Sequence, residues 1–371
     1  MLGTGVFAVW TPAWQLSGRL LLVSLAIATV VAVLNAISTA RLARVHPESG
    51  GAYAFGRLRL GRTAGVSAGL CFIIGKSASA AAAALTIGAY VWPGQERAIA
   101  WVALLIALAI DLRGIVRSTR VNAVLVAVVL TIVVSAIAVG AGSLPSATNA
   151  VQLPSTSAGA VIAAGGLVFV AFAGYARITV LGEEVRDPAR TIPRAMAWSF
   201  GIVLVVYAAV ALVVTTAGQR GVDLGPASLA SIVDLAQQPA LTGVVVLGAV
   251  IGAGSVLINL IAGMGRTIFA MASRGDAPAA LAAVSRVKVP HRAAIAAALL
   301  AGVLVIPGRL SWALALSGAC ILGYYAVAHA SSLAMPGPWW AQRVVPVAGL
   351  LLCVVVVVSL VVLVIQGGVP A

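Results

Sequence analysis

The sequence predicts an all-α polytopic membrane protein, and three observations support this fold class. The 371 residues are 62% hydrophobic and only 9% charged, a composition that water-soluble domains do not have. The apolar residues form runs long enough to cross a bilayer, which takes about 20 residues in a helix. The basic residues fall between these runs in an alternating pattern, as they do in the loops of membrane proteins.

Ten apolar segments are candidates for membrane-spanning helices, and a further one, 5–16, is too short to span alone. Two of the ten are short, but charged residues or proline flank them. We therefore expect about 11 transmembrane helices. In chain order the ten segments cover residues 20–39, 63–91, 98–112, 121–141, 158–176, 196–217, 241–262, 293–306, 311–333 and 344–365.

The distribution of Lys and Arg predicts the orientation of these helices. Of the 23 basic residues, 18 fall in one alternating set of loops. The other set of loops has only four, which are Arg19, Arg97, Arg220 and Arg309. Loops rich in Lys and Arg stay in the cytoplasm, so we expect a multi-pass protein of the cytoplasmic (cell) membrane. The net charge of +14 belongs to these loops, and it does not indicate nucleic-acid binding.

Two glycine-containing breaks interrupt the apolar segments, one in each half of the chain. Gly3, Thr4 and Gly5 open the first segment, and Phe172, Ala173, Gly174 and Tyr175 interrupt the segment 158–176. Inside a bilayer, backbone freed from a helix has no water to bind, so such breaks persist only where they line a cavity or a ligand site. A matching pair is typical of secondary transporters, which bind their substrate near the middle of the membrane.

Four motifs with a consistent order and topology now indicate a family. They are GTGVF at 3–7, PESGGAY at 47–53, GEEVRDP at 182–188 followed by Ile192, Pro193 and Arg194, and RTIFAMASRGDAP at 266–278. With them the chain resembles the permeases of the amino acid–polyamine–organocation (APC) superfamily. The resemblance implies a five-plus-five inverted repeat in which helices 1 and 6 are discontinuous, and transport by alternating access without ATP.

The resemblance also implies how the chain is divided. It predicts one transmembrane transporter domain over 1–371, with repeat 1 at about 1–142, repeat 2 at about 158–333 and an appended helix at about 344–366. Members of the superfamily carry a half-helix before the first glycine break and usually have twelve helices. In this sequence Met1 lies two residues before Gly3, so we expect a permease truncated at the N-terminus. Because we count about 11 helices, we also expect the last helix to be missing.

The two breaks are the predicted substrate site. Free N–H groups at Gly3, Thr4 and Gly5 suit an α-carboxylate, unless these residues are only a frayed terminus. The resemblance implies that carbonyl groups around Ala173 and Gly174 accept from an α-ammonium group. Phe172 or Tyr175 would close over the substrate as an aromatic gate, or would simply pack in the core.

Lys76 lies in the middle of the segment 63–91, among small and apolar residues. A lysine at the centre of a bilayer is costly and indicates function by default. We interpret it as a titratable group that couples transport to protons in place of a sodium ion; the alternative is a side chain that extends to the membrane surface. Ser255 and Asn259 share one face of the segment 241–262, where they bind an ion or hydrogen-bond across helices.

Four charged residues after the second break predict a cytoplasmic gate or latch: Glu183, Glu184, Arg186 and Asp187. Cys71, Cys320 and Cys353 lie inside apolar runs, with no spacing that indicates a disulfide or a metal site. We expect no cofactor and no metal.

The leading hypothesis is a proton-coupled permease for amino acids or related amines, whose partners are a small-molecule substrate and the lipid bilayer. The scarcity of acidic residues within the spans argues against a carrier dedicated to cationic amino acids, because buried cations need partners. Two alternatives stay open. One is a truncated paralogue that does not transport, and the other is an integral-membrane transferase, for which the chain offers only nine acidic residues and three His.

Overall fold

The structure is a computed structural model that describes residues 3–45, 51–114, 119–145, 156–174, 188–285 and 289–368. These ranges are almost entirely helical and contain no strand, so the predicted all-α class is confirmed. Seven helices are long and apolar enough to cross a membrane, while α8 and α12 are apolar but shorter.

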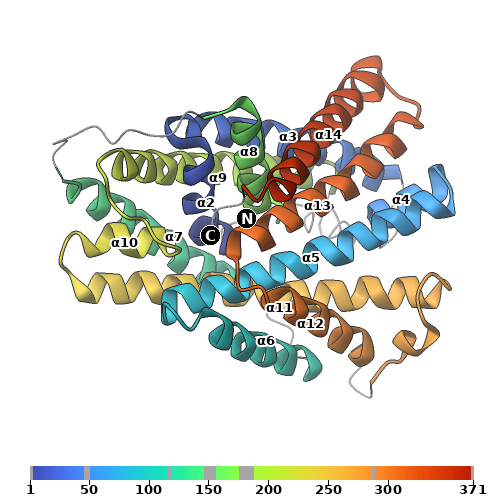
Figure 1. Cartoon of the computed structure of the whole chain (residues 1–371). Coiled ribbons are helices and arrows are strands. Elements are labelled where there is room, and N and C mark those ends of the chain that lie inside the picture. Colours follow the sequence, from blue (N-terminus) through green and yellow to red (C-terminus); the bar gives the residue numbers. More distant parts are fainter. Residues whose placement is uncertain are drawn as a thin grey trace.

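Figure 1 shows the helices in chain order. Each of the ten predicted spanning segments overlaps one of them, and the segment 5–16 forms α1 and α2. Helix α10 is an additional short helix in the loop between two spans. The bounds are α1 Thr4–Ala8, α2 Trp10–Ser17, η1 Gly18–Leu20, α3 Leu21–Val45, α4 Ala52–Arg59, α5 Arg62–Val91, α6 Glu96–Leu112, α7 Thr119–Gly142, α8 Ala158–Phe172, α9 Pro188–Gln219, α10 Ser228–Asp234, α11 Pro239–Ser273, η3 Ala279–Ala282, α12 His291–Val305, α13 Leu310–Leu333, η4 Trp340–Val344 and α14 Val345–Ile365.

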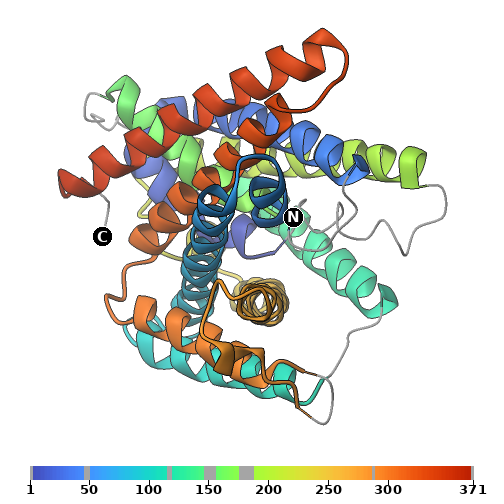
Figure 2. The same cartoon turned by 90° about the vertical axis from the view of Figure 1, so that its right-hand side faces the viewer.

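Helices α5 and α11 form the centre of the bundle, where they pack against each other (Figure 1). Figure 2 looks almost along α11 and shows the other helices arranged around this pair. Helix α13 packs against α5 and α14, and α3 packs against α8. The short helix α1 contacts α5, α8 and α11, so it lies between helices from both halves of the chain.

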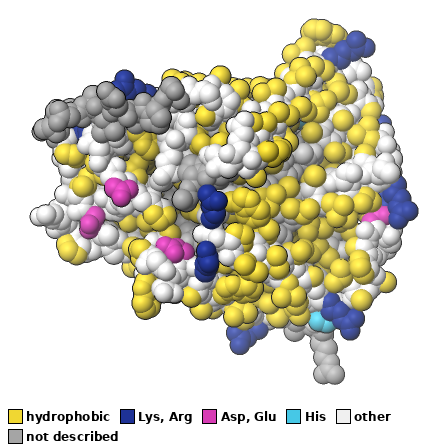
Figure 3. Space-filling model, viewed as in Figure 1, with side chains coloured by type: hydrophobic (Ala, Val, Ile, Leu, Met, Phe, Trp, Pro, Cys, Tyr) yellow, Lys and Arg dark blue, Asp and Glu magenta, His cyan; other side chains and the backbone are white. Residues whose placement is uncertain are grey.

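Small side chains make the close packing of α5 possible. Residues 80–84 are all alanine and are at most 1% exposed. A helix whose whole circumference is small can be approached by neighbours on every side, as is common in membrane bundles. The outer helices have the opposite pattern, since large side chains such as Leu105, Val205 and Leu351 are at least 60% exposed. Figure 3 shows a face covered largely by hydrophobic side chains, with the charged ones in a few small patches.

Arginine contacts in the structure agree with the orientation that the sequence predicts. Arg41 donates from Nη1 to the carbonyl oxygen of Ala341 at 2.6 Å, and both residues belong to the set of basic loops. Arg97 donates to the carbonyl oxygen of Pro307 at 3.1 Å, and both belong to the other set. The described contacts therefore join loops that are expected on the same side of the membrane.

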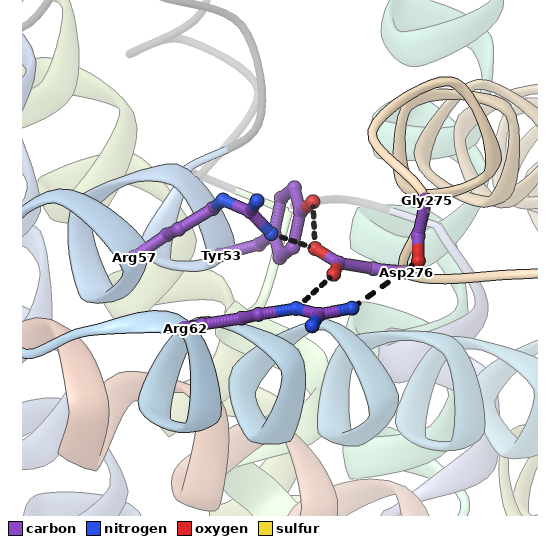
Figure 4. Close-up of polar contacts among 5 residues, drawn as sticks. All are labelled: Tyr53, Arg57, Arg62, Gly275 and Asp276. Atoms are coloured by element: carbon purple, nitrogen blue, oxygen red, sulfur yellow. Dashed lines mark hydrogen bonds and ion pairs between the residues drawn. The ribbon is translucent and has the colours of Figure 1, made fainter.

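A buried carboxylate connects two of the sequence motifs at one end of the bundle (Figure 4). Asp276 follows α11, and its side chain is 0% exposed. The hydroxyl group of Tyr53 donates to its Oδ2 at 2.7 Å, and Nε of Arg62 donates to its Oδ1 at 2.9 Å. Arg57 pairs with the same Oδ2. The network holds α4 and the beginning of α5 against the end of α11.

These partners change the pKa of Asp276. Burial by itself would raise the pKa, but the hydrogen bonds from Tyr53, Arg62 and Arg57 and the charge of Arg57 outweigh it and lower the pKa to about 2. An unfolded Asp has a pKa of about 3.9. The ionised network therefore stabilises the folded state fully above about pH 4, and this stabilisation is lost as the pH falls toward 2.

We expect Asp276→Asn to lower the melting temperature of the purified protein in detergent at pH 7, because the amide cannot accept from three donors and carries no charge. The difference from the wild type should shrink as the pH falls from about 4 to about 2. Asp234→Asn is the control, since Asp234 is exposed at the end of α10. Equal melting temperatures for Asp276→Asn and the control would contradict this role of the network.

Candidate functional site

A cavity of about 100 Å³ lies where α1, α5, α8, α11 and α13 meet, beside the residues at which α8 ends. The described lining is mostly small and apolar, and Lys76 is its charged residue. The lining residues are Thr4, Gly5, Lys76, Ser79, Ala82, Val170, Ala171, Ala173, Gly174, Val256, Leu260 and Leu314. Both predicted helix breaks and the predicted coupling lysine thus contribute to one cavity.

Helix α1 approaches α8 closely because residue 5 is glycine. A Cβ atom on Gly5 would lie 2.3 Å from Cβ and 2.4 Å from Cα of Ala171, distances that no side chain can occupy. The neighbouring Thr4 lines the cavity and is 8% exposed. Its Oγ1 is buried and has no hydrogen-bond partner. A buried hydroxyl without a partner is costly, so Thr4 can offer a hydrogen bond to a bound solute.

Helix α8 ends at the second break. Its last residue is Phe172, and the N–H of Ala173 donates to the carbonyl oxygen of Val170 at 3.2 Å, which tightens the final turn. The hydroxyl group of Tyr207, on α9, donates to the carbonyl oxygen of Ala171 at 3.1 Å. This bond satisfies one of the carbonyls that the break releases in an apolar environment.

Phe172 lies away from the cavity lining, although it belongs to the predicted site. Its side chain is 0% exposed. It packs edge-on against Tyr207, with ring centroids 5.1 Å apart, and parallel to Phe200 at 6.1 Å. The structure therefore places Phe172 in an aromatic cluster behind the break. Tyr175, the other candidate for an aromatic gate, lies outside the described residues.

Lys76 lies on the cavity face of α5. Its Nζ is 5.9 Å from the ring centroid of Phe72, one turn earlier, a distance at which a cation and an aromatic face attract each other. No described acidic side chain pairs with it. Ser79, one turn later on the same face, also lines the cavity, and its Oγ is 2.6 Å from Oγ of Ser317 on α13.

Ser255 and Asn259 do not line the cavity. Nδ2 of Asn259 donates to the backbone carbonyl oxygen of Ser255 at 2.9 Å, a bond within α11. The residues that follow each of them, Val256 and Leu260, face the cavity instead. Because one residue turns a helix by about 100°, the polar pair lies on the adjacent face.

All four residues of the predicted cytoplasmic gate lie outside the described residues: Glu183, Glu184, Arg186 and Asp187.

The described ranges contain no group of three or more His, Cys, Asp and Glu side chains that could hold a metal ion. His329 instead contacts Asn35, with Nε2 and Oδ1 2.7 Å apart, in a buried polar contact between α13 and α3.

Sequence reasoning missed several residues of the site. Ser79 could have been predicted from the sequence. It follows Lys76 by three positions, and residues i and i+3 share a face of a helix. Leu314 and Tyr207 carried no such signal. One contributes only apolar surface and the other acts on a backbone carbonyl from a neighbouring helix, so both depend on how the helices pack.

Comparisons with known proteins agree with this architecture. The amino acid permease family matches residues 1–369. An uncharacterized transporter of Mycobacterium tuberculosis is 43% identical over 366 residues, which are 97% of this chain and 83% of that protein. The branched-chain amino acid permease BcaP of Bacillus subtilis is 27% identical over 76% of this chain and 66% of its own length. A methylthioribose transporter of the same species is 29% identical over 79% of this chain and 68% of its own length.

The matched family covers nearly the whole chain, and these relatives are named as transporters. The described residues form a bundle of apolar helices with a cavity beside the start of α1 and the end of α8, as expected for a multi-pass protein of the cell membrane. The chain therefore belongs to the amino acid permease family.

Proposed function

We propose that the protein is a secondary active transporter that moves amino acids or related amines across the cell membrane by alternating access, coupled to protons through Lys76. One observation carries the proposal. Thr4 and Gly5 from one break, Ala173 and Gly174 from the other, and the lysine all line a single cavity. A cavity between broken helices in the membrane is where a solute replaces the missing backbone partners.

The α-carboxylate of the substrate binds on the α1 side of the cavity. The hydroxyl group of Thr4 donates to it, together with backbone N–H groups at Gly3 and Gly5. The unpartnered Oγ1 of Thr4 supports this assignment, because an ordered solute would supply the hydrogen bond that this buried hydroxyl lacks.

The α-ammonium group binds on the α8 side, where it donates to carbonyl oxygens of the last turn. The carbonyl of Ala171 is already occupied by Tyr207, which leaves those of Ala173 and Gly174 as acceptors. Gly5 keeps the two binding sides close together. A solute that bridges them would hold α1 and α8 together, and its release would let them separate, which is the motion that alternating access needs.

Lys76 carries the coupled proton. An ammonium group in a low-dielectric cavity without a carboxylate partner is costly. Its proton is therefore exchanged with whichever side of the membrane the cavity faces. The absence of a described acidic partner supports this role, because a tight ion pair would hold the proton in place.

Uptake of a labelled amino acid mixture into proteoliposomes, with and without an inward proton gradient, tests the proposal. A gradient of one pH unit corresponds to about 1.36 kcal/mol, so one coupled proton can drive about tenfold accumulation. Gradient-dependent uptake is expected. If no amino acid or amine enters proteoliposomes that contain correctly folded protein, the proposed function is wrong.

Substitution of Lys76 should separate coupling from binding. Lys76→Ala removes the proton carrier, and Lys76→Arg keeps a charge that does not release its proton. Both variants should lose gradient-driven accumulation and keep exchange of internal for external substrate. Arg343→Ala, which removes an exposed cation elsewhere, should behave like the wild type. If both Lys76 variants accumulate substrate normally, Lys76 is not the coupling residue.

Gly5→Ala should abolish uptake, since its methyl group would overlap the backbone of Ala171 and force α1 away from α8. We expect a loss of stability of about 1–3 kcal/mol, typical of overpacking. Gly201→Ala is the matched control, because Gly201 lies exposed within α9 and a Cβ there meets open space. Thermal melting and uptake are measured on both variants. Normal uptake by Gly5→Ala would show that the close approach of the two helices is dispensable.

A further inference from the structure

We infer that the substrate is a small amino acid with an uncharged side chain, and that Lys76 and Leu260 set this selectivity by charge and by size. The inference rests on the proposed function, because it assumes that the cavity is the transport site. Neither the family nor the named relatives decide the substrate. One of those relatives is named for branched-chain amino acids and another for methylthioribose.

The first argument is charge. Lys76 is a charged residue in the cavity lining, and none of the described lining residues is acidic. The described acidic residues lie elsewhere: Glu96, Asp111, Asp223, Asp234 and Asp276 are in loops or at helix ends. A cationic side chain would therefore enter beside an ammonium group without a compensating carboxylate. At an effective dielectric constant of about 20, two like charges about 6 Å apart weaken binding by about 100-fold.

The second argument is size. A cavity of about 150 Å³ accommodates benzene, and this cavity measures about 100 Å³. It therefore suits only the smallest amino acids, glycine, alanine and serine, which have about five to seven non-hydrogen atoms. The size also argues against aspartate and glutamate, whose charge Lys76 would otherwise attract. Side chains of Val256, Leu260 and Leu314 close the apolar part of the lining, where a longer substrate side chain would have to lie.

The third argument is the hydrogen bonding of the polar side chains that line the cavity. Oγ of Ser79 already bonds to Oγ of Ser317, which uses part of its hydrogen-bonding capacity. Oγ1 of Thr4 has no partner, but it lies on the α1 side, where it is assigned to the carboxylate. The wall left for a substrate side chain is thus short and apolar.

The test is uptake of labelled alanine into proteoliposomes with a panel of unlabelled competitors. Glycine, alanine and serine should compete. Leucine and aspartate should compete weakly, and lysine should compete at least about 100-fold less well than alanine. If the wild type prefers leucine or lysine over alanine, the inference is wrong and the proposed function stands. If no amino acid is transported, the proposed function fails and the inference fails with it.

Two variants then assign the selectivity to residues. Leu260→Ala enlarges the cavity and should let leucine compete at least about tenfold better, since each buried methylene contributes about 0.8 kcal/mol. Leu247→Ala is the matched control on the same helix, because Leu247 is 59% exposed on the outer face of α11. Equal competition by leucine in the two variants would overturn the role of Leu260.

Lys76→Glu reverses the charge. It should make 2,4-diaminobutyrate, a cationic amino acid close to serine in size, an effective competitor. Lys76→Met removes the charge and should only weaken the exclusion of 2,4-diaminobutyrate. These variants are compared by exchange, which does not require proton coupling. An unchanged exclusion of 2,4-diaminobutyrate in both variants would overturn the role of Lys76. The new carboxylate of Lys76→Glu could disturb folding. Leu260→Ala and its control Leu247→Ala introduce no charge, so they test the size argument even if Lys76→Glu does not fold.

Discussion

The contact between Gly5 and Ala171 is the constraint on which the rest of the candidate site depends. Because residue 5 has no side chain, α1 lies directly against the last turn of α8. This brings the start of α1 and the end of α8 to one cavity, although about 170 residues separate them in the sequence. In a bilayer both would otherwise leave backbone groups without partners. Tyr207 satisfies one of the carbonyls at the end of α8.

Acidic side chains and Lys76 occupy different parts of the bundle. The described carboxylates lie in loops or near helix ends, and Asp276 uses its charge to bind Tyr53, Arg57 and Arg62 where α11 ends. Lys76 is placed in the cavity instead, with only an aromatic ring as a described neighbour of its charge. A cation within a membrane bundle that has no carboxylate partner is costly. This cost is accounted for if the lysine exchanges a proton and repels cationic solutes.

The sequence was sufficient for the helices and for the residues at their breaks, because both follow from local composition. Apolar runs give the spans, and the glycines at 3, 5 and 174 mark the breaks. It was not sufficient for the orientation of side chains. Ser255 and Asn259 lie one residue from Val256 and Leu260, and Phe172 lies behind the break, since helix rotation is decided by packing between distant segments. The sequence also did not predict the partners of Asp276, although Tyr53 and Asp276 each lie in one of the four motifs.

The most direct test of the central claim, that the cavity binds an amino acid, is protection of a cysteine placed in it. Thr4→Cys would be introduced into a chain whose Cys71, Cys320 and Cys353 are replaced by alanine, with Leu247→Cys on the outer face of α11 as the control. Alanine should slow the alkylation of the cysteine at position 4 and leave the control unchanged. Equal alkylation rates with and without alanine and other amino acids would contradict the claim.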